Sequence, residues 1–320
     1  MNIGFRHVPF NDEQRAALDA IAHDAGRGTI WFSSEGDPSI EELATCEALM
    51  GYFPPATFKS LPELRWVQTP AAGVERLCGD IYARKDVVLT NGSGAFGIDI
   101  AEYVVGGVLS LFRHLPAYHT AQAERSWGRQ GVGRSICDST VCVIGCGNVG
   151  STIAERMKAL GAACVRGMDR TRDIASPAFD EHYLMDEPEA ALAGADIVAV
   201  SLPSTPETQK FVSARFFECM NEGTVFANVG RGVTVDQDAL TAALQEGKIA
   251  GAVLDVFEVE PLPQESPLWG LENVIVTPHV AGWDDDLVNV RALFEIFREN
   301  LTRYLAGDEL THVVDRARGY

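Results

Sequence analysis

The sequence has little positive charge, no Cys-x-x-Cys pair and no apolar run of membrane-spanning length, and each absence excludes a class of function. Its 320 residues include 45 Asp and Glu against 26 Lys and Arg, which gives a formal charge of −19. The resulting field repels polyanions, so we expect neither nucleic acid nor an anionic membrane as a partner. A small anionic substrate remains compatible, because one arginine can reverse the local potential inside a cleft.

Cysteine usage and the N-terminus both indicate a cytoplasmic protein. The seven cysteines stand at positions 46, 78, 137, 142, 146, 164 and 219. An odd number closes no complete disulfide set, so we expect free thiols, with Cys142 and Cys164 packed in the core of two strands. The first residues lack the pattern of a signal peptide. The longest apolar region, 103–111, is too short to cross a bilayer and contains two glycines.

The first 98 residues are predicted to form a small α/β unit. Segments 29–32, 66–69 and 87–90 have the composition of strands, and 40–50 is predicted to be a helix. Apolar residues then recur at helical spacing over 99–125, which predicts a helix that joins two domains. Ser93 and Gly94, just before it, would suit a hinge.

From residue 139 onwards the pattern repeats strand and helix, which predicts a parallel, doubly wound sheet. The predicted strands are 140–144, 163–168, 195–200, 223–227, 249–255 and 273–277, with a helix over 152–160 after the first. A long amphipathic helix over 285–305 would return the chain to the first domain. The expected fold is therefore α/β, with a Rossmann-type dinucleotide-binding domain at 99–288. A smaller flavodoxin-like α/β substrate-binding domain would comprise 1–98 and 289–320.

A glycine-rich motif, Gly145-Cys146-Gly147-Asn148-Val149-Gly150, lies between the first predicted strand and helix of that sheet. Gly145 permits the tight turn, Gly147 lets a pyrophosphate approach the backbone, and Gly150 lets the helix pack closely against the strand. The N-terminus of the helix then offers N–H groups and partial positive charge to the phosphates. This context predicts a dinucleotide site.

The next strand ends in Asp169, which is placed to accept hydrogen bonds from ribose hydroxyls and would repel a 2′-phosphate. That favours NAD(H). Arg170 and Arg172 follow directly, and arginines at this point can bind the extra phosphate of NADP(H), although they also fit a solvated loop. NADP(H) is therefore the open alternative.

Three polar residues, Arg231, Glu260 and His279, follow three successive predicted strands. Ligands of open parallel sheets bind beyond the carboxyl ends of the strands, so we expect these side chains to share a site. Hydride addition to a ketone builds negative charge on oxygen, which calls for a cation and a proton donor. Arg231 offers a planar fork that matches a carboxylate. A carboxylate at Glu260 would favour the imidazolium form of His279, which is the form that donates a proton.

With these motifs in this order, the chain resembles the D-isomer-specific 2-hydroxyacid dehydrogenase family over nearly its whole length. The motifs that carry the resemblance are Ala72-Gly73-Val74, Ala101-Glu102, the glycine-rich motif, 228–232, 255–261, Pro278-His279 and the closing 314–320. The resemblance implies that Arg231 binds substrate, Glu260 supports the acid, and His279 is the acid–base.

The same resemblance implies further contacts. The backbone N–H groups of Ala72, Gly73 and Val74 would bind the substrate carboxylate. Asp255 would hold the nicotinamide carboxamide, and Pro203 and Thr208 would border the cofactor. The length and the ending Arg318-Gly319-Tyr320 are most similar to the short glyoxylate/hydroxypyruvate reductases, and a homodimer is implied. An NADH-sensing, corepressor-like interaction protein of the same fold is the alternative function.

Other polar and aromatic residues have less defined roles. Trp283 is expected to line the substrate pocket or to belong to the core at a domain junction. His114 and His119 show no metal-ligand spacing and are expected at the surface or an interface, so we expect no metal site. The helix around 103–115 combines apolar residues with glycines, which would suit packing against a second subunit.

Overall fold

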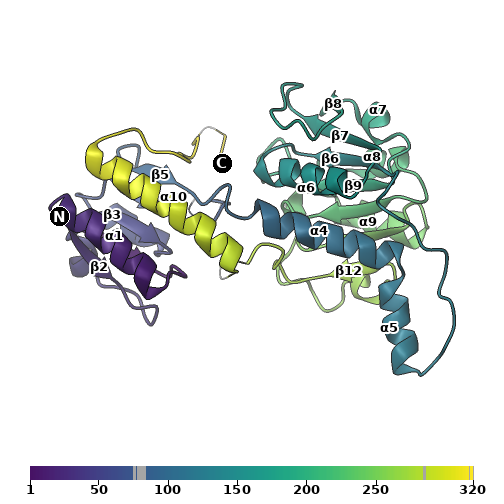
Figure 1. Ribbon diagram of the computed structural model, residues 1–320, viewed down its shortest axis with the longest axis horizontal. Coiled ribbons are helices and arrows are strands. Elements are labelled where there is room, and N and C mark those ends of the chain that lie inside the picture. Colours follow the sequence, from purple (N-terminus) through teal and green to yellow (C-terminus); the bar gives the residue numbers. More distant parts are fainter. Residues whose placement is uncertain (75–76, 78–83, 284–285, 317, 320) are drawn as a thin grey trace. The chain divides into compact units, whose positions relative to one another are not determined.

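The computed structural model describes residues 1–74, 77, 84–283, 286–316, 318 and 319 (Figure 1). The chain divides into two compact units, which we call unit 1 (Met1–Phe96 with Trp283–Tyr320) and unit 2 (Gly97–Gly282). The boundaries expected from the sequence lie at 98 and 288, against 96 and 282 here. Cys78, Asp285, Ala317 and Tyr320, which enter the sequence predictions, lie outside the described residues.

Unit 1 is built on a five-stranded parallel sheet. Its strands are β1 (Asn2–Arg6), β2 (Gly28–Trp31), β3 (Cys46–Gly51), β4 (Trp66–Gln68) and β5 (Val88–Thr90). They lie in the order β2-β1-β3-β4-β5, and every pair is parallel. This is the strand order of flavodoxin-like folds, so the predicted class of the smaller domain is confirmed.

Two helices of unit 1 lie side by side, although they come from opposite ends of the chain (Figure 1). They are α1 (Asp12–Asp24) and α10 (Leu287–Ala306). Asn11 starts α1 with a capping box, and Gly307 ends α10 in the left-handed conformation. Phe10 packs edge-on against Phe297 of α10, with ring centroids 5.2 Å apart. The C-terminal helix thus completes the core of the first unit.

The predicted helix at 40–50 is wrong. The structure has a single turn, α2 (Ile40–Leu43), capped by Ser39, and then the strand β3. β3 lies between β1 and β4 and is buried along most of its length. A strand buried on both faces shows no alternation of apolar and polar residues, so its short apolar run is indistinguishable from a buried helix by pattern alone. The same reason explains why β1 was not predicted.

Unit 2 contains a seven-stranded parallel sheet in the order β12-β11-β10-β9-β6-β7-β8. The strands are β6 (Thr140–Ile144), β7 (Cys164–Asp169), β8 (Glu181–Leu184), β9 (Ile197–Val200), β10 (Val225–Asn228), β11 (Gly251–Leu254) and β12 (Val274–Val276). Because β6 is central and the chain winds outward in both directions, the predicted doubly wound sheet is confirmed. The edge strand β8 was not predicted, since it is polar and only partly buried.

Helices cover both faces of this sheet and enclose two hydrophobic cores, one on each face. The larger helices are α4 (Gly97–Phe112), α5 (Leu115–Ala123), α6 (Asn148–Ala159) and α9 (Gln237–Gln245), and the shorter ones are α7 (Pro188–Leu192) and α8 (Ala214–Cys219). No helix of the described residues is long and apolar enough to cross a membrane.

The single helix predicted over 99–125 is in fact two. His114, between α4 and α5, has a left-handed backbone with a φ of 55°, and Pro116 occupies the first turn of α5. Proline supplies no N–H group, and in a continuous helix its ring would clash with the carbonyl of Phe112 four residues earlier, so α4 ends there. Gly107 of α4 faces the unit's own sheet, because a Cβ atom there would come within 2.5 Å of Val253. That glycine therefore serves packing inside unit 2.

Candidate functional site

The glycine-rich motif forms the turn between β6 and α6. Gly145 has a φ of +92°, a conformation that glycine adopts without strain. A Cβ atom at Gly150 would lie 1.9 Å from the carbonyl oxygen of Gly145, so helix and strand are in close contact there. At Gly147, by contrast, an added Cβ would meet no atom within 4 Å. The turn thus leaves open space beside Gly147, where a phosphate group could approach the backbone.

The N-terminus of α6 faces that space. Gly147 is its N-cap, and no side chain among the described residues caps the helix. The first helical hydrogen bond runs from Ser151 N to Gly147 O, at 2.9 Å. The N–H groups of Asn148, Val149 and Gly150 precede it in the first turn and have no partner within the helix. Such a terminus binds anions, so the residues present fit a dinucleotide pyrophosphate.

Asp169 ends β7 and ties the glycine turn to that strand. Its Oδ2 accepts a hydrogen bond from Cys146 N at 2.7 Å, and its Oδ1 accepts one from Arg170 N at 2.6 Å. A carboxylate has about four acceptor positions, so room for ribose hydroxyls remains. Arg172 is engaged elsewhere, because its guanidinium pairs with Glu187 at 2.5 Å and donates to His182 O at 2.7 Å.

The loop after β9 contains Pro203 and Thr208, the residues expected to border the cofactor. Thr208 is buried, and its hydroxyl donates to Pro203 O at 2.6 Å and accepts from Thr205 N at 2.8 Å. The Thr208 side chain therefore stabilises the loop 203–208 through hydrogen bonds within that loop. Arg170 lies near this loop. Hydrogen bonds from the Glu207 backbone and from the Thr205 side chain lower the pKa of the Glu207 carboxyl, and the positive charge of Arg170 lowers it further.

Arg231 stands on a tight loop after β10. Asn228 fixes the loop, since its Oδ1 accepts from Gly230 N at 3.2 Å and its Nδ2 donates to Arg231 O at 3.3 Å. A Cβ at Gly232 would come within 1.9 Å of the backbone of Phe257, so the loops after β10 and β11 are in direct contact. This contact brings the backbone of Arg231 close to the segment that leads to Glu260.

His279 and Glu260 form a hydrogen-bonded pair. The ring nitrogen Nδ1 of His279 lies 2.8 Å from Glu260 Oε2, and Glu260 Oε1 accepts from Phe257 N at 3.1 Å. A carboxylate only accepts, so Nδ1 donates and Nε2 is the nitrogen that can reach a substrate. The side chains are 46% and 28% exposed, which leaves the ring accessible. The two loops thus present an imidazole held by a carboxylate.

Asp255 holds the loop that carries His279. Its carboxylate is buried and accepts from Thr277 Oγ1 at 2.6 Å, Val280 N at 2.8 Å and Ala281 N at 2.9 Å. Its backbone carbonyl accepts from His279 N at 2.9 Å. Its expected contact with the nicotinamide carboxamide stays a prediction. Thr277, and Tyr103 behind it, were not singled out in the sequence, because no spacing pattern connects α4 with a loop 174 residues later.

The predicted substrate loop, Ala72-Gly73-Val74, belongs to unit 1. Asn91 Nδ2 donates to Ala72 O at 2.8 Å, and Gly92 N donates to Ala71 O at 2.9 Å. Val74 is buried in the core of unit 1, whereas Ala72 and Gly73 are partly exposed. Asn91 is a further residue that the sequence did not reveal, since an isolated Asn after a strand carries no distinctive pattern.

Other sequence candidates are placed as follows. Trp283 is 54% exposed, and its carbonyl accepts from Asn289 Nδ2 at 2.6 Å. His114 Nε2 lies 3.0 Å from Val132 O, and His119 is exposed on α5. Cys142 is fully buried in β6, while Cys164, at the start of β7, is only partly buried. Within the described residues, no group of three His, Cys, Asp or Glu side chains could hold a metal ion.

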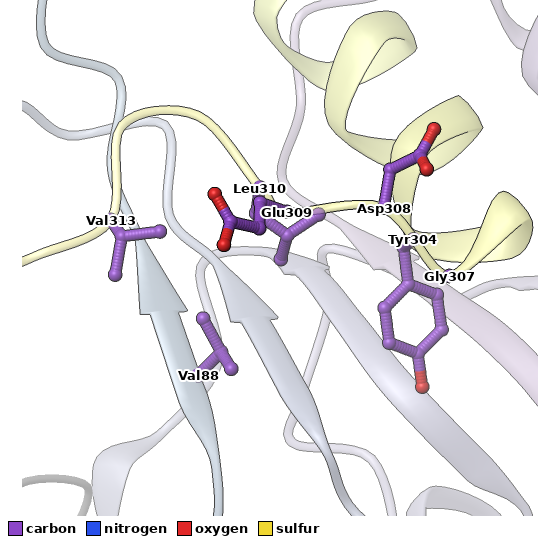
Figure 2. A pocket seen from close by; sticks show the side chains of 7 residues that line it. All are labelled: Val88, Tyr304, Gly307, Asp308, Glu309, Leu310 and Val313. Atoms are coloured by element: carbon purple, nitrogen blue, oxygen red, sulfur yellow. The ribbon is translucent and has the colours of Figure 1, made fainter.

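Unit 1 also has an open pocket of about 490 Å³ (Figure 2). It is lined by Val88, Tyr304, Gly307, Asp308, Glu309, Leu310 and Val313. Its lining combines apolar side chains with two carboxylates and includes no basic group, so it does not suit an anionic substrate. None of the predicted site residues belongs to it.

Comparison with known proteins identifies similar chains. Residues 105–281 match the family model for the NAD-binding domain of D-isomer-specific 2-hydroxyacid dehydrogenases. A solved structure of a D-isomer-specific 2-hydroxyacid dehydrogenase family protein from Aeromonas salmonicida is 33% identical, with a TM-score of 0.85, over 98% of this chain and 99% of that chain.

Two further solved structures contain bound ligands. A D-isomer-specific 2-hydroxyacid dehydrogenase from Xanthobacter autotrophicus, in complex with NADPH and MES, is 32% identical, with a TM-score of 0.80, over 100% of this chain and 99% of that one. An NADPH-dependent glyoxylate/hydroxypyruvate reductase from Sinorhizobium meliloti, in complex with NADP and sulfate, is 29% identical, with a TM-score of 0.82, over 100% of both chains.

Proposed function

Because the chain belongs to the D-isomer-specific 2-hydroxyacid dehydrogenase family, we propose that it reduces a small 2-keto acid of the glyoxylate/hydroxypyruvate type to the corresponding 2-hydroxy acid. As a member of that family, it is an NAD(P)-dependent oxidoreductase acting on the CH–OH group of 2-hydroxy acids. The observation that carries the proposal is the 2.8 Å pair between His279 and Glu260, because it supplies a proton donor next to the dinucleotide-binding fold of unit 2.

The residues of unit 2 would hold the cofactor in the following way. The turn from Gly145 to Gly150 and the first N–H groups of α6 would bind the pyrophosphate, and Asp169 would bind the ribose hydroxyls. Pro203 and Thr208 would border the dinucleotide, with Asp255 at its nicotinamide end. When bound, the reduced nicotinamide supplies the hydride.

The chain's own residues would bind the substrate and supply the proton. Arg231 would bind the substrate's carboxylate and stabilise the charge that develops on the carbonyl oxygen. The backbone N–H groups of Ala72, Gly73 and Val74 would share the carboxylate, and Trp283 would border it. His279 would donate the proton from Nε2 to the carbonyl oxygen, while Glu260 fixes the ring through Nδ1.

We propose NAD(H) as the preferred cofactor, with NADP(H) as the alternative. Asp169 supports NAD(H), because a carboxylate in this position repels a 2′-phosphate. The ion pair between Arg172 and Glu187 also supports it, because that arginine is already neutralised. The bound NADPH and NADP of the two relatives favour the alternative, with Arg170 as the residue that would bind the phosphate.

The test is a panel of 2-keto acids assayed with purified protein and with either NADH or NADPH. The proposal expects reduction of glyoxylate and hydroxypyruvate, with the higher kcat/KM for NADH. Reduction only of larger 2-keto acids would overturn the substrate class, and a preference for NADPH would overturn the role of Asp169. Binding of NADH without turnover of any keto acid would instead indicate an NADH-sensing interaction protein.

The proposed enzyme is a cytoplasmic homodimer. All six described cysteines are free, which supports a reducing compartment.

Figure 1 shows α5 and the segment after it extending away from the sheet of unit 2, with Leu115, Trp127 and Val132 exposed. Arg134 anchors that segment through an ion pair with Asp196 at 2.7 Å. Exposed apolar side chains on an anchored segment suit a second copy of the chain. Light scattering at micromolar concentration tests this, and a monomer would contradict it.

A further inference from the structure

The hydroxyl of Tyr103 is hydrogen-bonded to the loop that carries His279, although Tyr103 lies on α4. Tyr103 Oη is 2.6 Å from Thr277 Oγ1, and Thr277 Oγ1 is 2.6 Å from Asp255 Oδ1. All three residues belong to unit 2. Since a carboxylate can only accept, Thr277 donates to Asp255, and Tyr103 therefore donates to Thr277. The three side chains form one directed chain of hydrogen bonds.

Tyr103 keeps its proton over any usual assay range. Burial, opposed by the hydrogen bond with Thr277 and assisted by the nearby Asp255 carboxylate, raises the pKa of Tyr103 to about 12. The phenol is thus a permanent donor. Thr277 can then turn its own proton only towards Asp255, which fixes the Thr277 hydroxyl in one orientation.

The loop 277–281, at the end of this series of hydrogen bonds, has a constrained backbone. His279 has a left-handed backbone with a φ of 59°, and its N–H donates to Asp255 O at 2.9 Å. Such a conformation in a residue other than glycine costs free energy and persists only where the surroundings enforce it. The enforcing contacts are the bonds from Thr277, Val280 and Ala281 to the Asp255 carboxylate.

We propose that Tyr103 is a positioning residue for His279, acting through Thr277 and Asp255. Its hydroxyl completes the hydrogen-bond chain that fixes the loop 277–281 and, with it, the place of the imidazole. The catalytic part of this inference rests on the proposed function, because only a 2-keto acid reductase needs His279 as its proton donor. The structural part, that the hydroxyl restrains the loop, stands independently.

The alternative is that Tyr103 only packs α4 against the sheet, in which case its ring matters and its oxygen does not. Tyr103→Phe separates the two, because it keeps the ring and removes the hydroxyl. Tyr183→Phe is the matched control. Tyr183 also lies in unit 2, and its hydroxyl donates to Glu181 at 2.8 Å. Both residues belong to β8, at the opposite edge of the sheet from β12, which precedes the His279 loop.

The first measurement is amide hydrogen exchange of the intact protein, which requires no substrate. Loss of one neutral hydrogen bond should increase exchange at Val280 and Ala281 about fivefold in Tyr103→Phe and leave it unchanged in Tyr183→Phe. Unchanged exchange in both variants overturns the inference, whether or not the protein reduces a keto acid.

The second measurement is steady-state reduction of glyoxylate at saturating NADH. We expect kcat in Tyr103→Phe to fall about five- to tenfold, with KM for glyoxylate and the Kd of NADH within twofold of the wild type. A general weakening of the fold would also raise KM and the Kd of NADH, so equal changes in all three would contradict a positioning role. A wild type that reduces no 2-keto acid would overturn the proposed function, while the exchange result would still decide whether Tyr103 restrains the loop.

Discussion

In unit 2 the loop that carries His279 is held by one buried carboxylate, whereas in unit 1 the loop at 69–74 is held by neutral side-chain amides. Asp255 accepts three hydrogen bonds from its loop, two of them from backbone N–H groups. Asn91 gives the unit 1 loop one amide donor, at Ala72 O, and Gln68 Nε2 donates to Thr69 O at 3.0 Å. Hydrogen bonds to a charged group are roughly twice as strong as neutral ones, so the unit 2 loop is the more firmly fixed.

This difference matches the role proposed for each loop. A proton donor must lie within hydrogen-bond reach of the reacting oxygen, and an error of about 1 Å is costly, so a rigid loop suits His279. The unit 1 loop would only bind a carboxylate through backbone N–H groups, which tolerates more movement. Damage to the first loop should therefore lower kcat, and damage to the second should raise KM.

The largest effect on loop restraint is expected from Asp255→Asn. An Asn side chain keeps one acceptor oxygen, but its NH₂ group would face one of the backbone N–H groups that now donate to the carboxylate. Hydrogen bonds to charged groups contribute about 1.5–3 kcal/mol, so we expect a loss of stability of about that size in unit 2. Thermal unfolding measures that loss of stability. In steady-state reduction, kcat should fall at least about tenfold.

Asp236→Asn is the control for that variant. The Asp236 side chain accepts from Ala239 N at the start of α9, so the substitution removes a carboxylate of similar function outside the His279 loop. If both variants lose kcat equally, the special role of the Asp255 loop is contradicted.

The next effect is expected from Glu260→Gln. Gln keeps a hydrogen-bond acceptor for Nδ1 of His279 but removes the negative charge beside the ring. A hydrogen bond to a charged group is stronger than a neutral one, so the ring should be held less firmly and kcat should fall about five- to tenfold. Steady-state reduction at saturating NADH measures this fall.

The matched control is Glu258→Gln, on the same loop. Glu258 pairs with Lys210 at 3.1 Å, so its substitution removes the same charge from a different partner. An equal fall in kcat in both variants would contradict a specific coupling between Glu260 and His279.

The smallest effect is expected in unit 1. Asn91→Ala removes the hydrogen bond to Ala72 O, and a neutral bond contributes about 1 kcal/mol. We expect KM for the keto acid to rise about fivefold with kcat nearly unchanged. Asn273→Ala is the control, because its side chain donates to Ala250 O at 3.3 Å outside the predicted substrate loop. A fall in kcat with constant KM in Asn91→Ala would break the proposed division between the two loops.

The sequence predicted the doubly wound sheet well and the small unit less well. The glycine motif, Asp169 and the six strands of unit 2 other than β8 have strong local patterns, so they could be recognised without coordinates. β3 was assigned to a helix, because burial on both faces removes the alternation that identifies strands. The break at His114 was missed, since Pro116 alone did not interrupt the apolar spacing strongly enough.

The residues that support the site could not be predicted for a different reason. Thr277 and Tyr103 meet the predicted residue Asp255 only because α4 packs against β10 and β11, and no local pattern connects them. The supporting role of Asn91 similarly depends on its hydrogen bond to Ala72, nineteen residues earlier in the sequence. Side chains with distinctive chemistry were visible in the sequence, whereas their supporting hydrogen bonds depend on tertiary structure.

The most direct test of the central claim is His279→Ala, assayed for reduction of glyoxylate and separately for NADH binding by fluorescence. General acid catalysis typically contributes about 10²–10⁴-fold, so kcat should fall by at least about 10²-fold while the Kd of NADH changes little. His182→Ala, which removes a surface imidazole from β8, should retain activity. Retention of more than a tenth of the wild-type kcat by His279→Ala would contradict the account, because the proton would then come from another group.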